Sequence, residues 1–197
     1  MAEIDEPPSI QSEPIEEKFQ KLLWVAEACV GARIITPALV LVYSGIDAAG
    51  WLYSANPNAA SWVRFTAWVS KYLLPAGNLG CTPLELYGAR CGIVHNFTSE
   101  SNLSKEGKVR QIIYAWGASS IDTLREMSAI TKMEDFTEVK VEGLIASFRQ
   151  GLAHFFEDAA ANPKIAARLA ERSGKILGPM SDGDGKALLK WVKDRIS

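Results

Sequence analysis

The sequence predicts a mainly α-helical protein, namely a helical bundle, up-and-down in its first four helices, with a small antiparallel β-ribbon after the fourth helix. Three observations support this class. Apolar residues recur at helical spacing along most of the chain. Cap and turn signals separate these segments at short intervals. Only two short stretches show the β-branched or alternating pattern that is typical of strands.

The first three helices are predicted from their start and stop signals. Residues 15–32 place apolar side chains at helical spacing, with charged residues between them. Thr36-Pro37 starts a second helix, which occupies about 36–53. The turn signal at 56–58 precedes a third helix that ends at about Leu74.

The fourth helix, at about residues 83–96, has the best-defined start. Thr82 is the predicted N-cap, Pro83 the first helical residue and Glu85 the reciprocal partner in a capping box. We therefore expect this helix, which carries the candidate catalytic residues, to begin at a defined position.

The second half of the chain combines the predicted ribbon with further helices. Residues 109–116 and 137–141 are the predicted strands, and 120–132 is a helix between them. A long helix follows over 142–161, and another begins at Asn162-Pro163 and ends at about 177.

The sequence indicates one structured domain between two extensions. Residues 1–14 contain three prolines and four acids, which predicts a flexible acidic tail. Residues 15–177 are the helical domain, and a chain of 197 residues is long enough for a sizeable core. Residues 178–197 are a C-terminal helical extension, which ends in a short helix from Lys186.

Composition restricts the classes of function. The net charge is −2, so an RNA contact would need a local basic patch. Three cysteines without a Cys-x-x-Cys pair, and an acidic N-terminus unlike a signal peptide, favour reduced thiols in a cytoplasmic protein. No zinc constellation or phosphate-binding glycine loop occurs, so we expect neither a metal nor a cofactor.

Residues 37–55 are nearly uncharged and are the best candidate for a membrane span. Asp47 lies in the middle of this segment, and a lone carboxylate at the bilayer centre costs about 2.5–3.5 kcal/mol. A buried core helix is therefore the favoured interpretation, and no membrane partner is expected.

Arg90 and His95 are the candidate catalytic pair. An arginine that holds a phosphate beside a titratable imidazole is a minimal set for RNA cleavage. Positions i and i+5 of a helix lie about 140° apart in angle and about 7.5 Å apart in rise. The pair could flank one substrate group only near a helix end or where a second copy of the helix faces the first.

The second arrangement predicts a homodimer through the helix that carries Arg90 and His95. The small residues Gly88, Ala89 and Gly92 would let another backbone come close. The simpler alternative is structural: Arg90 pairs with a surface carboxylate, and His95 lies near a helix C-terminus, where the dipole favours a cation.

Two motifs resemble the HEPN (higher eukaryotes and prokaryotes nucleotide-binding) superfamily. One is Leu86-Tyr87-Gly88-Ala89-Arg90-Cys91-Gly92-Ile93-Val94-His95, which looks like the LY-x-x-RCG-x-x-H form of bacterial HEPN-like proteins. The other is Gly45-Ile46-Asp47-Ala48, which looks like a GIDA segment upstream in such proteins. The resemblance covers about residues 20–160. It implies a commonly dimeric helical domain and, in many members, a metal-independent endoribonuclease that is often a toxin, abortive-infection or defence protein.

The resemblance also implies a mechanism. His95 would act as general base or acid on the ribose 2′-OH or the 5′-oxygen leaving group. Arg90 would hold the scissile phosphate and stabilise its developing charge, and the product would be a 2′,3′-cyclic phosphate. Asp47 would orient His95 or Arg90, or would instead be a buried acid satisfied by Ser44, by backbone or by another helix. RNA would be the substrate, and a toxin would have an antitoxin as a partner.

Three residues around the motif are candidate supporting residues. Tyr87 could stack on a base or be half-buried packing. Cys91 could be a reactive thiolate beside Arg90 or an inert buried thiol. Asn96 directly follows His95.

A short basic segment follows the motif. Lys105, Lys108 and Arg110 could form a local phosphate-binding strip for RNA. The alternative is a solvated loop, since Glu100 and Glu106 dilute the positive charge.

One departure from the family pattern supports an alternative function. Active members usually carry a polar residue, often Asn, directly after the Arg, where this chain has Cys91. The alternative is a catalytically inactive HEPN-like module that binds RNA or nucleotide or mediates protein association, and a helical adaptor is a third class. An enzyme predicts Arg90 and His95 exposed in one cleft, whereas a binding module predicts a basic surface with His95 buried or misdirected.

Overall fold

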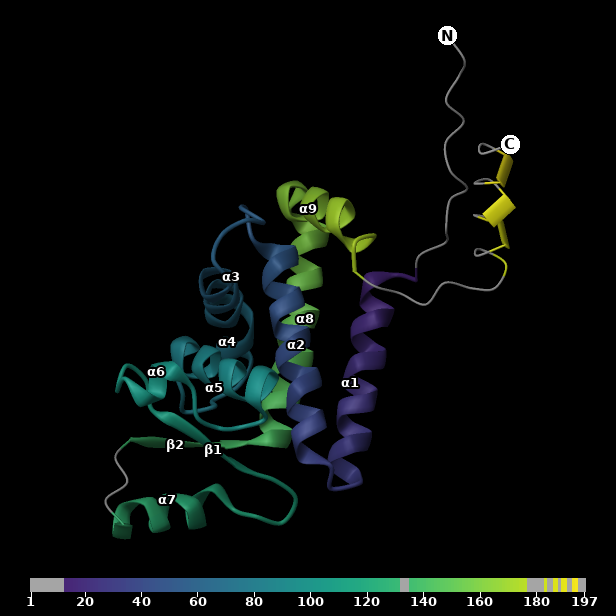
Figure 1. Ribbon diagram of the computed structural model, residues 1–197. Helices are drawn as coiled ribbons and strands as arrows, with labels where there is room; N and C mark the ends of the chain where they lie inside the picture. The colour runs from purple at the N-terminus through teal and green to yellow at the C-terminus, as the bar shows by residue number, and fades with distance from the viewer. Residues whose placement is uncertain are drawn as a thin grey trace.

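The fold is mainly α-helical with a two-stranded sheet (Figure 1). The computed structural model describes residues 13–131 and 135–176, and beyond these residues 183, 186–187, 189–190 and 193–194. The predicted acidic tail, up to residue 12, and most of the predicted C-terminal extension lie outside the described residues.

Three long helices run side by side and form the centre of the molecule (Figure 1). They are α1 (Ile15–Gly31), α2 (Ile35–Tyr53) and α8 (Val141–Ala161). A continuous helical segment packs against α2 and α8; it consists of α3 (Ser61–Trp68), the π-helical turn η1 (Val69–Leu73) and α4 (Leu74–Ala76). The last described helix, α9 (Pro163–Ser173), packs on α2 and α8. These elements confirm the predicted helices to within a few residues, except that α9 ends before residue 177.

Aromatic side chains fill the core between these helices. Trp68 is fully buried, and its ring centroid lies 5.7 Å from that of Phe148 and 6.4 Å from that of Phe155. Fully burying one such side chain contributes roughly 1.5–3 kcal/mol relative to exposing it.

Helix α2 is long and apolar enough to cross a membrane by length and composition, and it is the one such helix among the described residues. In this fold its side chains Val42, Ile46 and Leu52 are fully buried in the core. The Tyr43 hydroxyl also shares a 2.5 Å hydrogen bond with the Tyr114 hydroxyl, which connects α2 with the sheet.

Helix α5 (Pro83–Asn96) begins as the sequence predicts. The Thr82 hydroxyl accepts a hydrogen bond from the Glu85 N–H at 3.2 Å, and the Glu85 carboxylate accepts one from the Thr82 N–H at 2.7 Å. This helix lies across α2 (Figure 1), so the up-and-down arrangement does not extend to the predicted fourth helix. Leu86 on one side of this helix is buried in the core, and the chain after residue 97 packs over Gly92.

The two strands are parallel, so the prediction of an antiparallel ribbon was wrong. Strand β1 (Gln111–Ala115) pairs with β2 (Phe136–Lys140), with Gln111 opposite Phe136 and Ala115 opposite Lys140. Helix α7 (Ile121–Thr131) lies between them in the chain. A connection that contains a helix can carry the chain from the end of β1 back to the edge of the sheet where β1 begins. Two parallel strands need such a crossover connection.

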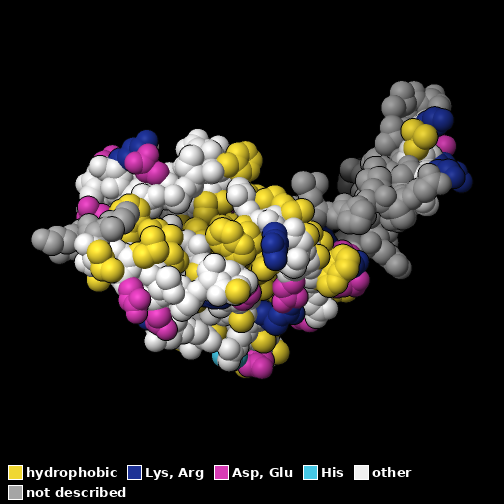
Figure 2. Space-filling view, turned by 90° about the horizontal axis from the view of Figure 1, so that it is seen from below, with side chains coloured by type: hydrophobic (Ala, Val, Ile, Leu, Met, Phe, Trp, Pro, Cys, Tyr) yellow, Lys and Arg dark blue, Asp and Glu magenta, His cyan; other side chains and the backbone are white. Residues whose placement is uncertain are grey.

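Figure 2 shows the face of the molecule seen from below, where hydrophobic side chains gather across the centre. Lysine and arginine side chains on this face are scattered among acidic ones. Proteins bind the phosphate backbone of a nucleic acid through several Lys or Arg side chains together, and this face shows no such cluster of Lys and Arg among the described residues.

Candidate functional site

Arg90 connects the candidate catalytic residues. Its Nε donates a hydrogen bond to Asp47 Oδ2 at 2.5 Å, and its Nη2 forms an ion pair with the same oxygen. Its Nη1 lies 2.8 Å from His95 Nε2. Three side chains that the sequence singled out, from α2 and from two turns of α5, therefore form one continuous hydrogen-bonded group.

The end of α5 explains how residues five positions apart can meet. The helix ends at Asn96, and Phe97 then takes the left-handed conformation with φ of 54°. His95 is therefore in the last turn and is exposed, where the long Arg90 side chain can span the rise between the two residues. The contact near a helix end is the first of the two arrangements that the spacing allowed.

Donor and acceptor chemistry defines the state of His95 in this arrangement. A guanidinium has only donors, so His95 Nε2 must accept the hydrogen bond from Arg90 Nη1. The imidazole is then neutral, with its proton on Nδ1. A neutral imidazole can act as a general base through Nε2 once Arg90 Nη1 no longer occupies the lone pair of that atom.

Partial burial affects the pKa values of both members of the Arg90–Asp47 pair. Burial raises the pKa of the Asp47 carboxyl above its ordinary value, and the charge of Arg90 opposes that rise. Burial also opposes the charged form of Arg90, but Asp47 outweighs this effect, and the pKa of Arg90 is raised. The side chains are 15% exposed for Arg90 and 23% for Asp47. Asp47 is thus a partly buried acid whose partner is Arg90, whereas Ser44 is exposed.

His95 also lines a groove of about 540 Å³, which we call the His95 groove. The supporting candidates Tyr87, Cys91 and Asn96 line it as well. The Tyr87 hydroxyl is 2.8 Å from Ser61 Oγ, and burial raises the pKa of Tyr87. Cys91 is a partly buried free thiol, and Asn96 is exposed.

The glycines of α5 shape this groove. A Cβ at Gly92 would lie 2.6 Å from the carbonyl oxygens of Thr98 and Glu100. A Cβ at Gly88 would lie 3.1 Å from Val109 Cγ2. The segment that these small residues allow to come close is thus the chain's own, which turns back over α5 and forms one wall of the groove.

We expect Gly92→Ala to lower the free energy of unfolding by about 1–3 kcal/mol, because a backbone carbonyl cannot move aside as a flexible side chain can. Helix propensity alone predicts the opposite, a gain of up to about 1 kcal/mol. Urea denaturation of this variant and of Gly88→Ala, whose nearest neighbour is a side-chain atom, measures the difference. A Gly92→Ala variant at least as stable as the wild type would contradict the packing argument.

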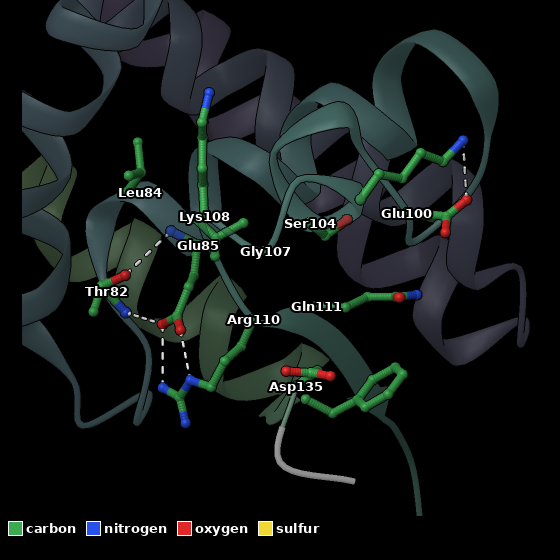
Figure 3. A pocket seen from close by; sticks show the side chains of 13 residues that line it. Thr82, Leu84, Glu85, Glu100, Ser104, Gly107, Lys108, Arg110, Gln111 and Asp135 are labelled. Atoms are coloured by element: carbon green, nitrogen blue, oxygen red, sulfur yellow. Dashed lines mark hydrogen bonds and ion pairs between the residues drawn. The ribbon is translucent and has the colours of Figure 1, made fainter.

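The three cations of the predicted RNA-binding strip lie in another cavity, of about 610 Å³ (Figure 3). Each pairs with a carboxylate: Lys105 Nζ with Glu100 at 3.1 Å, Lys108 Nζ with Glu106 at 2.6 Å and Arg110 Nε with Glu85 at 2.6 Å. These acids neutralise the strip locally. Leu84 lines both this cavity and the His95 groove, so the two lie next to each other. None of the three cations of the strip lines the groove at His95.

Sequence reasoning missed the contribution of α3. Arg64 lies close enough to Asp47 for its charge to act against the rise in the pKa of that carboxyl. Trp62 lines the His95 groove, and Ser61 holds the Tyr87 hydroxyl. No local pattern marks these residues, because their role depends on how α3 packs against α2 and α5.

Among the described residues, no three His, Cys, Asp or Glu side chains come together in a way that could hold a metal ion. The hydrogen-bonded group at the site consists of one imidazole, one guanidinium and one carboxylate. Comparisons with protein-family models, with curated proteins and with solved structures found no match to this chain.

Proposed function

We propose that the protein is a HEPN-like, metal-independent endoribonuclease that acts as a toxin or in phage defence. The observation that carries this proposal is the arrangement of Arg90 between Asp47 and the exposed His95. Asp47 contacts Nε and Nη2 of Arg90, and Nη1 donates to His95 Nε2. A substrate phosphate that takes over the Nη1 donor would therefore lie directly beside the imidazole.

The reaction follows from these two groups. A scissile phosphate would replace His95 as the partner of Arg90 Nη1, and the guanidinium would stabilise the charge that develops on it. His95 Nε2 would take the proton of the ribose 2′-OH as the 2′-oxygen attacks phosphorus. The bond from phosphorus to the 5′-oxygen then breaks, the leaving oxygen takes a proton from a general acid, the protonated His95 of the second copy in the proposed dimer, and a 2′,3′-cyclic phosphate remains.

A homodimer through α5 is part of the proposal. The reaction needs a base and an acid, and a two-fold axis would place a second Arg90–His95 pair in the same cleft. Phe97, at the end of α5, supports this arrangement because its side chain is 71% exposed. RNA would be the substrate, and an antitoxin would be a further partner in the toxin setting.

The function is tested by incubating the full chain with a mixed RNA pool in EDTA. We expect cleavage that leaves 2′,3′-cyclic phosphate ends, because the proposed reaction uses the ribose 2′-OH and no metal. The ends are measured by mass spectrometry of the fragments. A folded protein that leaves the pool intact, or leaves only linear 3′-phosphates from the first minute, would contradict the proposal.

Asp47 is a positioning residue in this proposal. Asp47→Asn keeps the shape of the side chain but removes the charge that holds Arg90 Nε and Nη2. We expect kcat/KM to fall by about tenfold, the equivalent of about 1.4 kcal/mol of lost transition-state stabilisation. Asp122→Asn on α7, which removes an exposed acid paired with an arginine, is the matched control and should leave kcat/KM unchanged. If Asp47→Asn and Asp122→Asn have the same kcat/KM, Asp47 does not position Arg90 for catalysis.

A catalytically inactive HEPN-like module that binds RNA or nucleotide, or mediates protein association, is the second candidate. The observation that favours it is Cys91, which stands where active members of the superfamily usually carry a polar residue and which lines the groove as a partly buried thiol. Binding of RNA without cleavage in the EDTA experiment would favour this module over the enzyme.

A further inference from the structure

The His95 groove differs in character from the centre around Arg90. None of the described residues that line it is Asp, Glu, Lys or Arg. Its walls include Trp62, Tyr87 and Leu103, and its polar groups include the side-chain amides of Asn96 and Asn102. A groove of this kind does not attract a phosphate, but it suits a flat, apolar ring with polar edges.

The position of Trp62 is determined by a specific contact. The hydroxyl of Tyr87 on α5 shares a 2.8 Å hydrogen bond with Ser61, the residue directly before Trp62. The Tyr87 ring also packs against Phe65 of α3, with the ring centroids 5.5 Å apart. The start of α3 is therefore held against α5, and Trp62 lies at the groove with its side chain 52% exposed.

Trp62 has an unoccupied aromatic surface. In the described part of the chain, the ring-to-ring contacts of tryptophan are those of the buried Trp68, and Trp62 stacks on no other ring. An exposed indole beside two carboxamides can stack on a nucleobase and bind its polar edge.

The groove is also continuous with the proposed catalytic centre. His95 lines the groove and also contacts Arg90 through Nε2. A nucleotide whose phosphate lies at Arg90 would therefore have its base within reach of the groove.

We infer that the His95 groove is a nucleobase subsite, in which Trp62 stacks on an unpaired base of the RNA and the amides of Asn96 and Asn102 read its edge. This inference rests on the proposed RNA substrate, and it deepens the proposal because it makes cleavage specific for a base in single-stranded RNA. A volume of about 540 Å³ is sufficient for a base together with its ribose.

The test measures binding separately from cleavage. Fluorescence anisotropy follows the full chain binding to labelled 2′-O-methyl pentaribonucleotides of each of the four bases, and to an abasic pentamer with the same backbone. The 2′-O-methyl group removes the nucleophile, so binding is measured without reaction. We expect one base to bind at least about fivefold more tightly than the weakest one, and the abasic pentamer to bind more weakly than all four.

The variants identify the subsite. Trp62→Ala should weaken binding of the preferred pentamer by roughly 5- to 150-fold, the loss expected for one stacked base. Trp62→Phe should restore most of that affinity. Trp24→Ala on α1, which removes a tryptophan that is 69% exposed and does not line the groove, is the matched control and should bind like the wild type.

The outcomes separate this inference from the proposed function. Cleavage of natural RNA by Trp62→Ala with unchanged rate and unchanged base preference would overturn the subsite but leave the ribonuclease. Base-selective, Trp62-dependent binding without cleavage would leave the subsite and overturn the ribonuclease. Equal binding of the abasic and the preferred pentamers would show that the groove holds no base. The same conclusion would follow if Trp62→Ala kept its affinity for RNA but lost the dimer, as measured by sedimentation.

Discussion

His95→Ala should lower the rate of RNA cleavage in EDTA by about 10²- to 10⁴-fold, the usual contribution of a positioned general base or acid. His95 Nε2 accepts a hydrogen bond from Arg90 Nη1, and in the proposed reaction the phosphate takes over Nη1, which leaves Nε2 to accept the 2′-OH proton. Alanine removes the imidazole without leaving a buried cavity, because His95 is exposed at the end of α5. The rate is measured as single-turnover cleavage of a labelled RNA.

The chain offers a matched control for this variant. His154 is the other histidine, and it is exposed on α8, a helix that contributes no residue to the His95 groove. His154→Ala should therefore cleave at the wild-type rate. A His95→Ala variant that cleaves like the wild type would place the chemistry elsewhere, and an equal loss in both variants would indicate a general effect on folding.

Arg90→Ala should lower the rate by about 10²- to 10³-fold, as removal of one donor to a developing oxyanion does in other enzymes. The loss has two physical causes. The phosphate loses the Nη1 donor, and Asp47 loses its ion-pair partner while it stays partly buried. Arg90→Lys keeps the charge next to Asp47 but loses the planar fork that contacts Asp47 and His95 at the same time, so it should recover only part of the rate.

Folding must be measured alongside this rate, because a partly buried carboxyl without a partner also lowers the free energy of unfolding. Arg149→Ala is the control, since it removes an arginine that pairs with Glu27 at 2.5 Å on the exposed surface between α8 and α1. It should leave cleavage unchanged. Wild-type cleavage by a folded Arg90→Ala variant would rule out this guanidinium as the phosphate ligand.

Local signals in the sequence predicted most of the helices. The capping box at Thr82 and Glu85 is a contact within one turn, so four consecutive residues contain all the information that starts α5. Helical spacing of apolar residues likewise predicted α1 and α8, because each presents an apolar face to the core.

The strand direction shows where local signals fail. The patterns at 109–116 and 137–141 identified both strands, but alternation has the same appearance in parallel and antiparallel pairs. The helix predicted between the strands was the information that could have indicated parallel pairing, since a crossover needs such an element.

The sequence by itself determined which residues could form a site on α5 and where that helix begins, since caps, helical spacing and the positions of Arg90 and His95 are local properties. Only the tertiary structure decided that Asp47 binds Arg90, that Trp62 reaches the His95 groove and that Glu85 pairs with Arg110. These contacts join segments that lie apart in the chain. They depend on how α2, α3 and the loop after α5 pack around that helix, and spacing along the chain does not encode this packing.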